Sequence, residues 1–385
     1  MDWLYALVDA VAKFFAAIVV AIATLFGAAP QVVTQAPAPT QDIATTTRVT
    51  IQEPELQLTA PQSNTSPQAG EELPSVTPAA KIPTQLIQAP PAPPTATPAK
   101  SFSQINTEAR EALVNIICTT LRGGYFNPIS GSGVIVDSRG VILTAAHVAQ
   151  YLLLRDYGVP GNVNCIVRTG SPAEPSYRAT LFYLPPGWIA ENAYQIAQSQ
   201  SLGTGERDYA FLLITDTINP KVPLPSSFPA LELDFKERLL GEQILLAAYP
   251  AGFLSGEIIA SNLYASSALA YVTRLYSFEG AANDIDLFSI GGTILSQSGS
   301  SGGAAVSLKS GKLAGLISTA ILEGSTGERD LRAITLSYID DNLKSAGYGG
   351  IVGLLSGDLA AKATNFNAQV APGLTKQLEN ALENR

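Results

Sequence analysis

The chain contains one histidine, His147, and its surroundings suit proton transfer. It follows Leu143-Thr144-Ala145-Ala146, in which an apolar run ends in two small residues. A histidine at a strand end with compact neighbours can turn its imidazole into a cleft, and the imidazole shuttles protons readily near neutral pH. A lone structural histidine is the competing interpretation, and this segment alone does not exclude it.

An aspartate stands where it could orient that imidazole. Asp208 directly precedes the apolar run Tyr209–Ile214, which we expect to be a buried strand. A carboxylate at such an edge can accept a hydrogen bond from histidine Nδ1, fixing the tautomer and stabilising the imidazolium. Taken alone, Asp208 is better explained as an ordinary turn aspartate.

The third pattern is Ser298-Gly299-Ser300-Ser301-Gly302-Gly303. Its glycines allow a tight turn in which the N–H groups of Gly299 and Ser301 point into one concavity, where they could bind an oxyanion. A flexible Gly/Ser loop is the alternative, but a linker would not run directly into the apolar segment Ala304–Val306. If the three side chains meet, Ser301 Oγ can attack a carbonyl while His147 takes its proton, which is acyl transfer.

The elements around these residues are mostly short β-rich runs separated by Gly, Pro, Asp and Asn. This pattern of short strands and turn residues favours a closed or sandwiched all-β architecture over a parallel α/β one. The predicted strands are Ala112–Thr120, Ser132–Asp137, Val141–Thr144, Val163–Thr169, Tyr209–Ile214, Gln243–Ala248, Ala304–Val306, Leu313–Ser318 and Leu331–Leu336. A short capped helix over Ser103–Arg110 precedes them, and a closing helix over Ser337–Leu343, with a serine cap, follows them.

The joint occurrence of the three patterns, in the order His, Asp, Ser, resembles the trypsin-like (chymotrypsin-fold) serine proteases. It is most similar to the bacterial high-temperature-requirement type. The similar stretches are Gly131–Val148, Gly241–Gly252 and Leu313–Ser318. The resemblance implies two orthogonal six-stranded antiparallel β-barrels with a His147, Asp208 and Ser301 triad between them. It also implies an endopeptidase that acts on protein or peptide substrates.

The resemblance extends to the substrate-binding residues. It places Leu295, six residues before Ser301, at the base of the specificity pocket, and Ser318, Thr319 and Ala320 along the substrate. Since Leu295 carries no charge, we expect a small or medium apolar side chain at the cleavage site. Ser318 is also expected to help position Asp208.

The chain departs from the family pattern in two further respects. Ser300 stands where the digestive enzymes have an aspartate that pairs with a newly cut N-terminus, so activation by that insertion is not expected. No peptide-binding (PDZ-like) domain is expected after the protease domain.

The two cysteines, Cys118 and Cys165, lie on predicted strands that are neighbours in the implied barrel. A disulfide between them is therefore expected, and it fits an oxidising compartment. Two buried free thiols are the alternative.

Composition excludes several other classes. The net charge is −9 with no Lys/Arg-rich run, which is unsuited to nucleic acid. One histidine and two cysteines are too few for a usual zinc site. The chain also has no phosphate-binding glycine loop or dinucleotide fingerprint, so no metal or cofactor is expected.

Four parts are expected along the chain. Residues 1–29 contain the apolar run Phe14–Ala29 and are predicted to be an uncleaved signal anchor, a transmembrane helix. Residues 30–102 hold 14 of the 26 prolines and form a Pro/Ala/Thr-rich disordered linker. Residues 103–346 form the protease domain, and 347–385 a tail that is partly helical or disordered.

Two other interpretations of residues 1–29 are a cleaved signal peptide, which would give a secreted protein, and a soluble amphipathic helix. With an anchor, the protease domain would lie outside the cytoplasm, in the periplasm or at the cell surface. Two alternative functions remain at this stage. One is a catalytically silent, protease-like binding module, and the other is a structural envelope protein with a Pro-rich stalk.

Overall fold

The computed structural model describes residues 100–121, 129–197, 204–278, 284–321 and 324–384. The predicted membrane helix at 1–29 lies outside them, as does the predicted linker up to residue 99. None of the helices in the described ranges is both long and apolar enough to cross a bilayer. The predicted anchor therefore remains a prediction.

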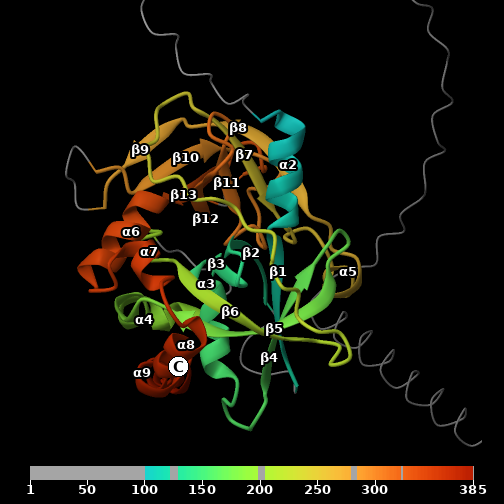
Figure 1. Ribbon diagram of the computed structural model, residues 1–385, viewed down its shortest axis with the longest axis vertical. Helices are drawn as coiled ribbons and strands as arrows, with labels where there is room; N and C mark the ends of the chain where they lie inside the picture. Colours follow the sequence, from blue (N-terminus) through green and yellow to red (C-terminus); the bar gives the residue numbers. More distant parts are fainter. Residues whose placement is uncertain (1–99, 122–128, 198–203, 279–283, 322–323, 385) are drawn as a thin grey trace, which may run out of the picture. The chain divides into compact units, whose positions relative to one another are not determined.

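The first sheet closes into a six-stranded antiparallel barrel (Figure 1). Around it the strands follow the order β1 (Leu113–Thr120), β2 (Ile129–Asp137), β3 (Val141–Thr144), β6 (Ala210–Thr217), β5 (Glu174–Tyr183) and β4 (Val163–Thr169). Most of these strands are rich in Val, Ile and Leu with buried side chains, which suits a pleated, packed surface. The first of the two predicted barrels is thus present.

The second sheet differs from the prediction, because it is a single curled seven-stranded sheet and not a second six-stranded barrel. Its order is β8 (Ser266–Tyr271), β7 (Gln243–Ala248), β11 (Ala304–Ser307), β12 (Leu313–Ile321), β13 (Asp330–Thr335), β10 (Leu287–Gly291) and β9 (Arg274–Tyr276). Register shifts at Ser289/Gly291 and Ile317/Ala320 mark bulges, which bend a sheet and increase its twist. Strands β8 and β9 pair on one side only, so this sheet keeps two edges.

Two predicted helices are present with different caps. Helix α2 (Phe102–Glu111) begins at Ser101, whose side chain and that of Gln104 form a capping box. Helix α6 (Leu336–Ser345) is capped by Thr335 and not by a serine, because the Thr335 hydroxyl accepts the N–H of Tyr338. Short helices occupy the connections: α3 (Ala146–Ala149), α4 (Pro186–Asn192), α5 (Gly256–Ser261), and two 3₁₀ turns, η1 (Gln150–Leu154) and η2 (Ala193–Ala197).

The C-terminal segment, which was expected to be partly helical or disordered, holds three helices: α7 (Gly350–Leu354), α8 (Leu359–Gln369) and α9 (Ala371–Glu383). Figure 1 shows α8 and α9 on the outside of the first barrel, beside α4. The Asn367 amide donates to the carbonyl of Leu181 on β5, and the Thr375 hydroxyl donates to the carbonyl of Leu153 on η1. These helices are therefore an integral part of the fold.

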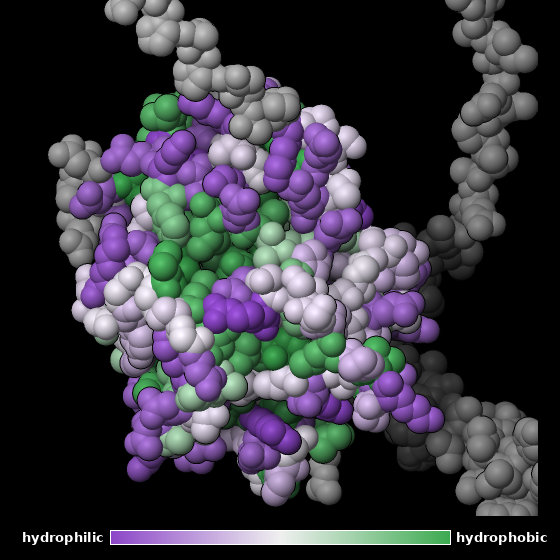
Figure 2. Space-filling view, viewed as in Figure 1, coloured by the Kyte–Doolittle hydropathy of each residue, from purple (hydrophilic) through white to green (hydrophobic). Residues whose placement is uncertain are grey.

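The core consists of two apolar clusters on opposite faces of the second sheet. Successive residues of β7 alternate between them: Leu245 lies in the larger cluster and Leu246 in the smaller. The larger cluster also fills the first barrel and reaches the C-terminal helices through Leu374, Leu378 and Leu382. Figure 2 shows apolar residues in the middle of the face seen in Figure 1, interrupted by a hydrophilic patch, and hydrophilic residues around its margin.

Helix α9 packs against the fold through leucines spaced four residues apart. Loss of this packing should therefore lower the stability of the protein. Leu378 is fully buried, so Leu378→Ala should lower the free energy of unfolding by about 2–5 kcal/mol. The matched control is Lys376→Ala on the exposed face of the same helix, for which a change within about 0.5 kcal/mol is expected. Urea unfolding of the full chain measures both, and equal effects would show that α9 does not pack as described.

Candidate active site

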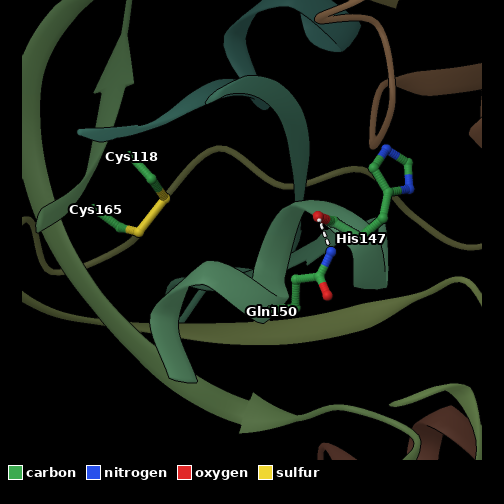
Figure 3. The surroundings of a disulfide bond; sticks show 4 residues. All are labelled: Cys118, His147, Gln150 and Cys165. Carbon is green, nitrogen blue, oxygen red and sulfur yellow. Dashed lines mark hydrogen bonds between the residues drawn. A yellow bond between two sulfur atoms is a disulfide. The ribbon is translucent and has the colours of Figure 1, made fainter. Parts of the chain in front are cut away.

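His147 lies in α3, which begins directly after β3. The small residues Ala145 and Ala146 are fully buried, which brings the backbone close to the barrel. The Gln150 side-chain amide donates to the His147 carbonyl at 3.0 Å and holds this turn (Figure 3). In Figure 3 the imidazole points away from both Gln150 and the disulfide, so its ring nitrogens are available to other residues.

Asp208 meets His147 because their strands are partners. Strand β3 pairs with β6 through Thr144 and Ala210, which brings Asp208, two residues before β6, close to His147, three residues after β3. The His147 backbone N–H donates to Asp208 Oδ1 at 2.9 Å, and His147 Nδ1 lies 2.8 Å from Asp208 Oδ2. The pairing thus fixes both the backbone and the ring of His147.

A third donor reaches the same carboxylate. The Ser318 hydroxyl, on β12 of the second sheet, donates to Asp208 Oδ2 at 2.7 Å. Asp208 is only 4% exposed, and a buried carboxylate is stable as an ion only when donors such as these surround it. The predicted contact between Ser318 and Asp208 is therefore present.

These contacts set the protonation of the pair. Burial alone would lower the pKa of His147, but the charge of Asp208 and the hydrogen bond to it outweigh burial and raise that pKa above its ordinary value of 6.5. Burial would likewise raise the pKa of Asp208, yet the charge and hydrogen bonds of His147 and the bond from Ser318 hold it below 3.8. An ionised Asp208 beside a basic imidazole suits a general base.

Ser301 lies at the other side of the site, in the turn between Leu295 and β11. Its hydroxyl donates to the Ser318 carbonyl at 3.3 Å, next to the residue that holds Asp208. The turn requires glycine, since Gly299 has φ 90° and Gly302 has φ 85°. A Cβ at Gly302 would overlap the carbonyl oxygen of Ser132 on β2, so the turn lies tightly against the first barrel.

Ser132 is a site residue that the sequence reasoning missed. Its hydroxyl donates to the Gly299 carbonyl at 2.7 Å and accepts the Tyr249 N–H at 2.8 Å. Its own N–H donates to the Ser301 carbonyl at 2.8 Å. One buried serine of the barrel therefore fixes the backbone on both sides of Ser300. The only signal in the sequence was its place between two glycines, Gly131 and Gly133.

The N–H groups of Gly299 and Ser301 have no hydrogen-bond acceptor among the described residues, although those of the neighbouring Ser300 and Gly302 do. Buried or half-buried N–H groups in proteins are normally paired. Two unpaired donors, one on each side of Ser300 and close to the Ser301 hydroxyl, are suited to an oxyanion.

The other predicted substrate-binding residues are Leu295, Thr319 and Ala320. Leu295 is completely buried in the smaller core cluster, so it offers no exposed surface to a substrate. Thr319 and Ala320 continue β12 beyond Ser318, and Ala320 pairs with Leu331 of β13. Their roles toward a substrate remain predictions, as does the role of Leu295.

The predicted disulfide is present. Cys118 on β1 and Cys165 on β4 are direct cross-strand partners and are joined by an S–S bond. The bridge closes a loop with a sequence separation of 47, and it stabilises the fold by about 4 kcal/mol in the chain-entropy model.

Within the described part of the chain, no three or more His, Cys, Asp or Glu side chains gather to hold a metal ion. That the protein needs no metal or cofactor remains a prediction.

Comparison with known proteins places this site in a family. Residues 131–316 match the model of the trypsin-like peptidase domain, a range that contains His147, Asp208 and Ser301. No curated protein matches the chain. A crystal structure of the active form of the Rv3671c protease from M. tuberculosis is 18% identical, with a TM-score of 0.39, and the match covers 70% of this chain and 95% of that one. The serine endoprotease from Yersinia pestis is 20% identical, with a TM-score of 0.39 and coverage of 64% and 68%.

The family match covers just under half of the chain and, together with the fold, supports the identification of the protein as a chymotrypsin-fold serine protease. The matched range contains strands of both sheets described above and supports a serine endopeptidase.

The raised pKa of His147 predicts the pH dependence of activity. A base must be unprotonated, so activity should appear only as the pH rises through the His147 pKa, and the acidic limb of kcat/KM should have its midpoint above 6.5. In Asp208→Asn the raising influence of the carboxylate is lost, so the midpoint should move to lower pH while kcat falls by about 10⁴. Rate profiles on a quenched fluorescent peptide measure both; a wild-type midpoint at or below 6.5 would contradict the assignment.

Proposed function

We propose that the protein is a membrane-tethered, extracytoplasmic serine endopeptidase that works through an acyl-enzyme, with His147, Asp208 and Ser301 as its triad. The observation that carries this proposal is the chain of contacts from His147 through Asp208 to Ser318, whose carbonyl accepts the Ser301 hydroxyl. These contacts join the first barrel to the second sheet, and His147, Asp208 and Ser301 lie within the range that matches the trypsin-like peptidase domain.

In the acylation step, the Ser301 hydroxyl turns from the Ser318 carbonyl toward the imidazole. Its oxygen attacks the scissile carbonyl carbon while His147 Nε2 takes its proton. The C=O bond becomes a C–O⁻ single bond, and the N–H groups of Gly299 and Ser301 bind the resulting oxyanion. Loss of one such donor typically costs about 10²–10³ in kcat.

The intermediate then collapses. His147 gives its proton to the leaving amine, the C–N bond breaks, and the acyl group stays on Ser301 as an ester. A water molecule, deprotonated by the same imidazole, attacks this ester and releases the second product. Asp208 stabilises the imidazolium in both halves of the reaction and is itself never protonated.

Asp208 and Ser132 have positioning roles in this scheme. Asp208 holds the backbone and ring of His147. Ser132 holds the turn that carries both oxyanion donors, through its bonds to Gly299 and Ser301. Positioning of this kind matters because a displacement of about 1 Å at the reacting atoms can cost about 10²-fold in rate.

The extracytoplasmic location rests on two features. The Cys118–Cys165 bridge is of the kind that persists in oxidising compartments. The apolar run at Phe14–Ala29 and the Pro-rich stretch after it would form an anchor and a spacer, and the spacer, if flexible, would span roughly 50 Å.

Nucleophilic activity of Ser301 can be tested directly. A fluorophosphonate probe should label the wild-type chain at Ser301, and Ser301→Ala should lose both the label and roughly 10³- to 10⁶-fold in peptide turnover. Ser300→Ala is the matched control, because its hydroxyl is buried without a hydrogen-bond partner in the described structure. A chain that binds peptides but neither cleaves them nor takes the label would be a silent binding module, contrary to the proposal.

The tether is tested separately by expressing the full chain and a variant that lacks residues 1–29. The full chain should sediment with membranes and resist extraction by high salt and carbonate, while the variant should be soluble and still take the fluorophosphonate label. A full-length chain found in the soluble fraction, or one whose mature N-terminus begins near residue 30, would contradict the anchor and leave the peptidase assignment intact.

A further inference from the structure

Three segments converge just before Ser301. A Cβ at Gly252 would lie 3.1 Å from the backbone nitrogen of Ser298, so the loop after β7 lies against the nucleophile turn. A Cβ at Gly292 would overlap the carbonyl oxygen of Gly327, so residues 324–329, the Arg329 loop, lie against the segment that leads from β10 to the nucleophile turn. Strand β12 also contacts the turn, because the Ser318 carbonyl accepts the Ser301 hydroxyl.

Contacts with these segments hold the guanidinium of Arg329 in place. Its Nη1 donates to the carbonyl of Ser296, five residues before Ser301, at 2.7 Å, and its Nε donates to the carbonyl of Gly324 at 3.3 Å. The guanidinium carbon also lies 5.6 Å from the ring centroid of Phe253. A guanidinium held by two carbonyls and an aromatic ring keeps one orientation.

The charge of Arg329 is not neutralised by its neighbours in sequence. The carboxylate of Glu328 accepts the backbone N–H and the hydroxyl of Ser325, each at 2.8 Å. Asp330 is paired with Arg332 at 2.8 Å and also bonds to Ser289. Over the described ranges Arg329 makes no ion pair, and its Nη2 donates no hydrogen bond.

An ordered cation with free donors, beside the turn that carries the nucleophile, is suited to a carboxylate. Arginine binds carboxylates through two parallel N–H···O bonds, which are stronger and more directional than bonds between neutral groups. Leu295, the residue expected to select an apolar side chain, is buried in the core and offers no competing surface.

We propose that Arg329 is a specificity-determining residue and that the protein prefers substrates with an acidic side chain at the residue whose carbonyl is attacked. This inference rests on the proposed function, because it assumes that this carbonyl lies at Ser301. It replaces the apolar preference expected from Leu295. The substrate class is thus proteins cleaved after Asp or Glu.

The test uses the full chain and quenched peptides that differ only at the residue before the scissile bond: Asp, Glu, Asn, Gln, Leu and Lys. The wild type should cleave the acidic peptides with kcat/KM about 10- to 100-fold above their amide isosteres. Arg329→Gln should abolish this ratio, and Arg329→Glu should favour Lys over Asp. The matched control is Arg178→Gln, an exposed arginine on β5, which should keep the wild-type ratio.

Fluorophosphonate labelling of each variant separates the possible failures. If the wild type takes the label and prefers Leu, or if Arg329→Gln keeps the acidic preference, this inference is wrong and the proposed function stands. If the wild type neither takes the label nor cleaves any peptide, the proposed function fails and the inference fails with it.

Discussion

The architecture depends on one buried carboxylate. Asp208 is almost completely removed from water, and an ionised carboxylate in that position is tolerable only when hydrogen-bond donors replace its hydration. The backbone of His147, its ring and the Ser318 hydroxyl are those donors. Since the donors come from both sheets, the two sheets must dock in one relative position for Asp208 to be satisfied, and that same position brings Ser301 to the site.

Ser132 makes the complementary connection. Asp208 accepts the hydroxyl of Ser318 on the second sheet. Ser132, on the barrel, donates its hydroxyl to the carbonyl of Gly299 in the turn before Ser301. The glycines of that turn are needed for close approach, because a side chain at Gly302 would collide with the barrel backbone. Outside the site, the C-terminal helices pack against η1, which continues α3, and so support the turn that carries His147.

Much of the first barrel and the key side chains could be predicted from sequence, because those signals are local. His147, Asp208 and Ser301 each adjoin an apolar run, and Cys118 and Cys165 stand on runs of the same kind. Strands such as β5 and β8 escaped prediction because half-exposed strands carry many Ser, Ala, Tyr and charged residues. The curvature of the second sheet depends on bulges, and the roles of Ser132 and Arg329 depend on contacts between distant segments, which no local pattern encodes.

The central claim is that Asp208 holds a basic imidazole with its proton on Nδ1, facing the carboxylate. The chain has a single histidine, so nitrogen NMR of the untagged protein reports on His147 without ambiguity. The neutral ring should show a protonated Nδ1 and an unprotonated Nε2, with a titration midpoint above 6.5. A proton on Nε2 in the neutral ring, or a midpoint unchanged in Asp208→Asn, would contradict the account.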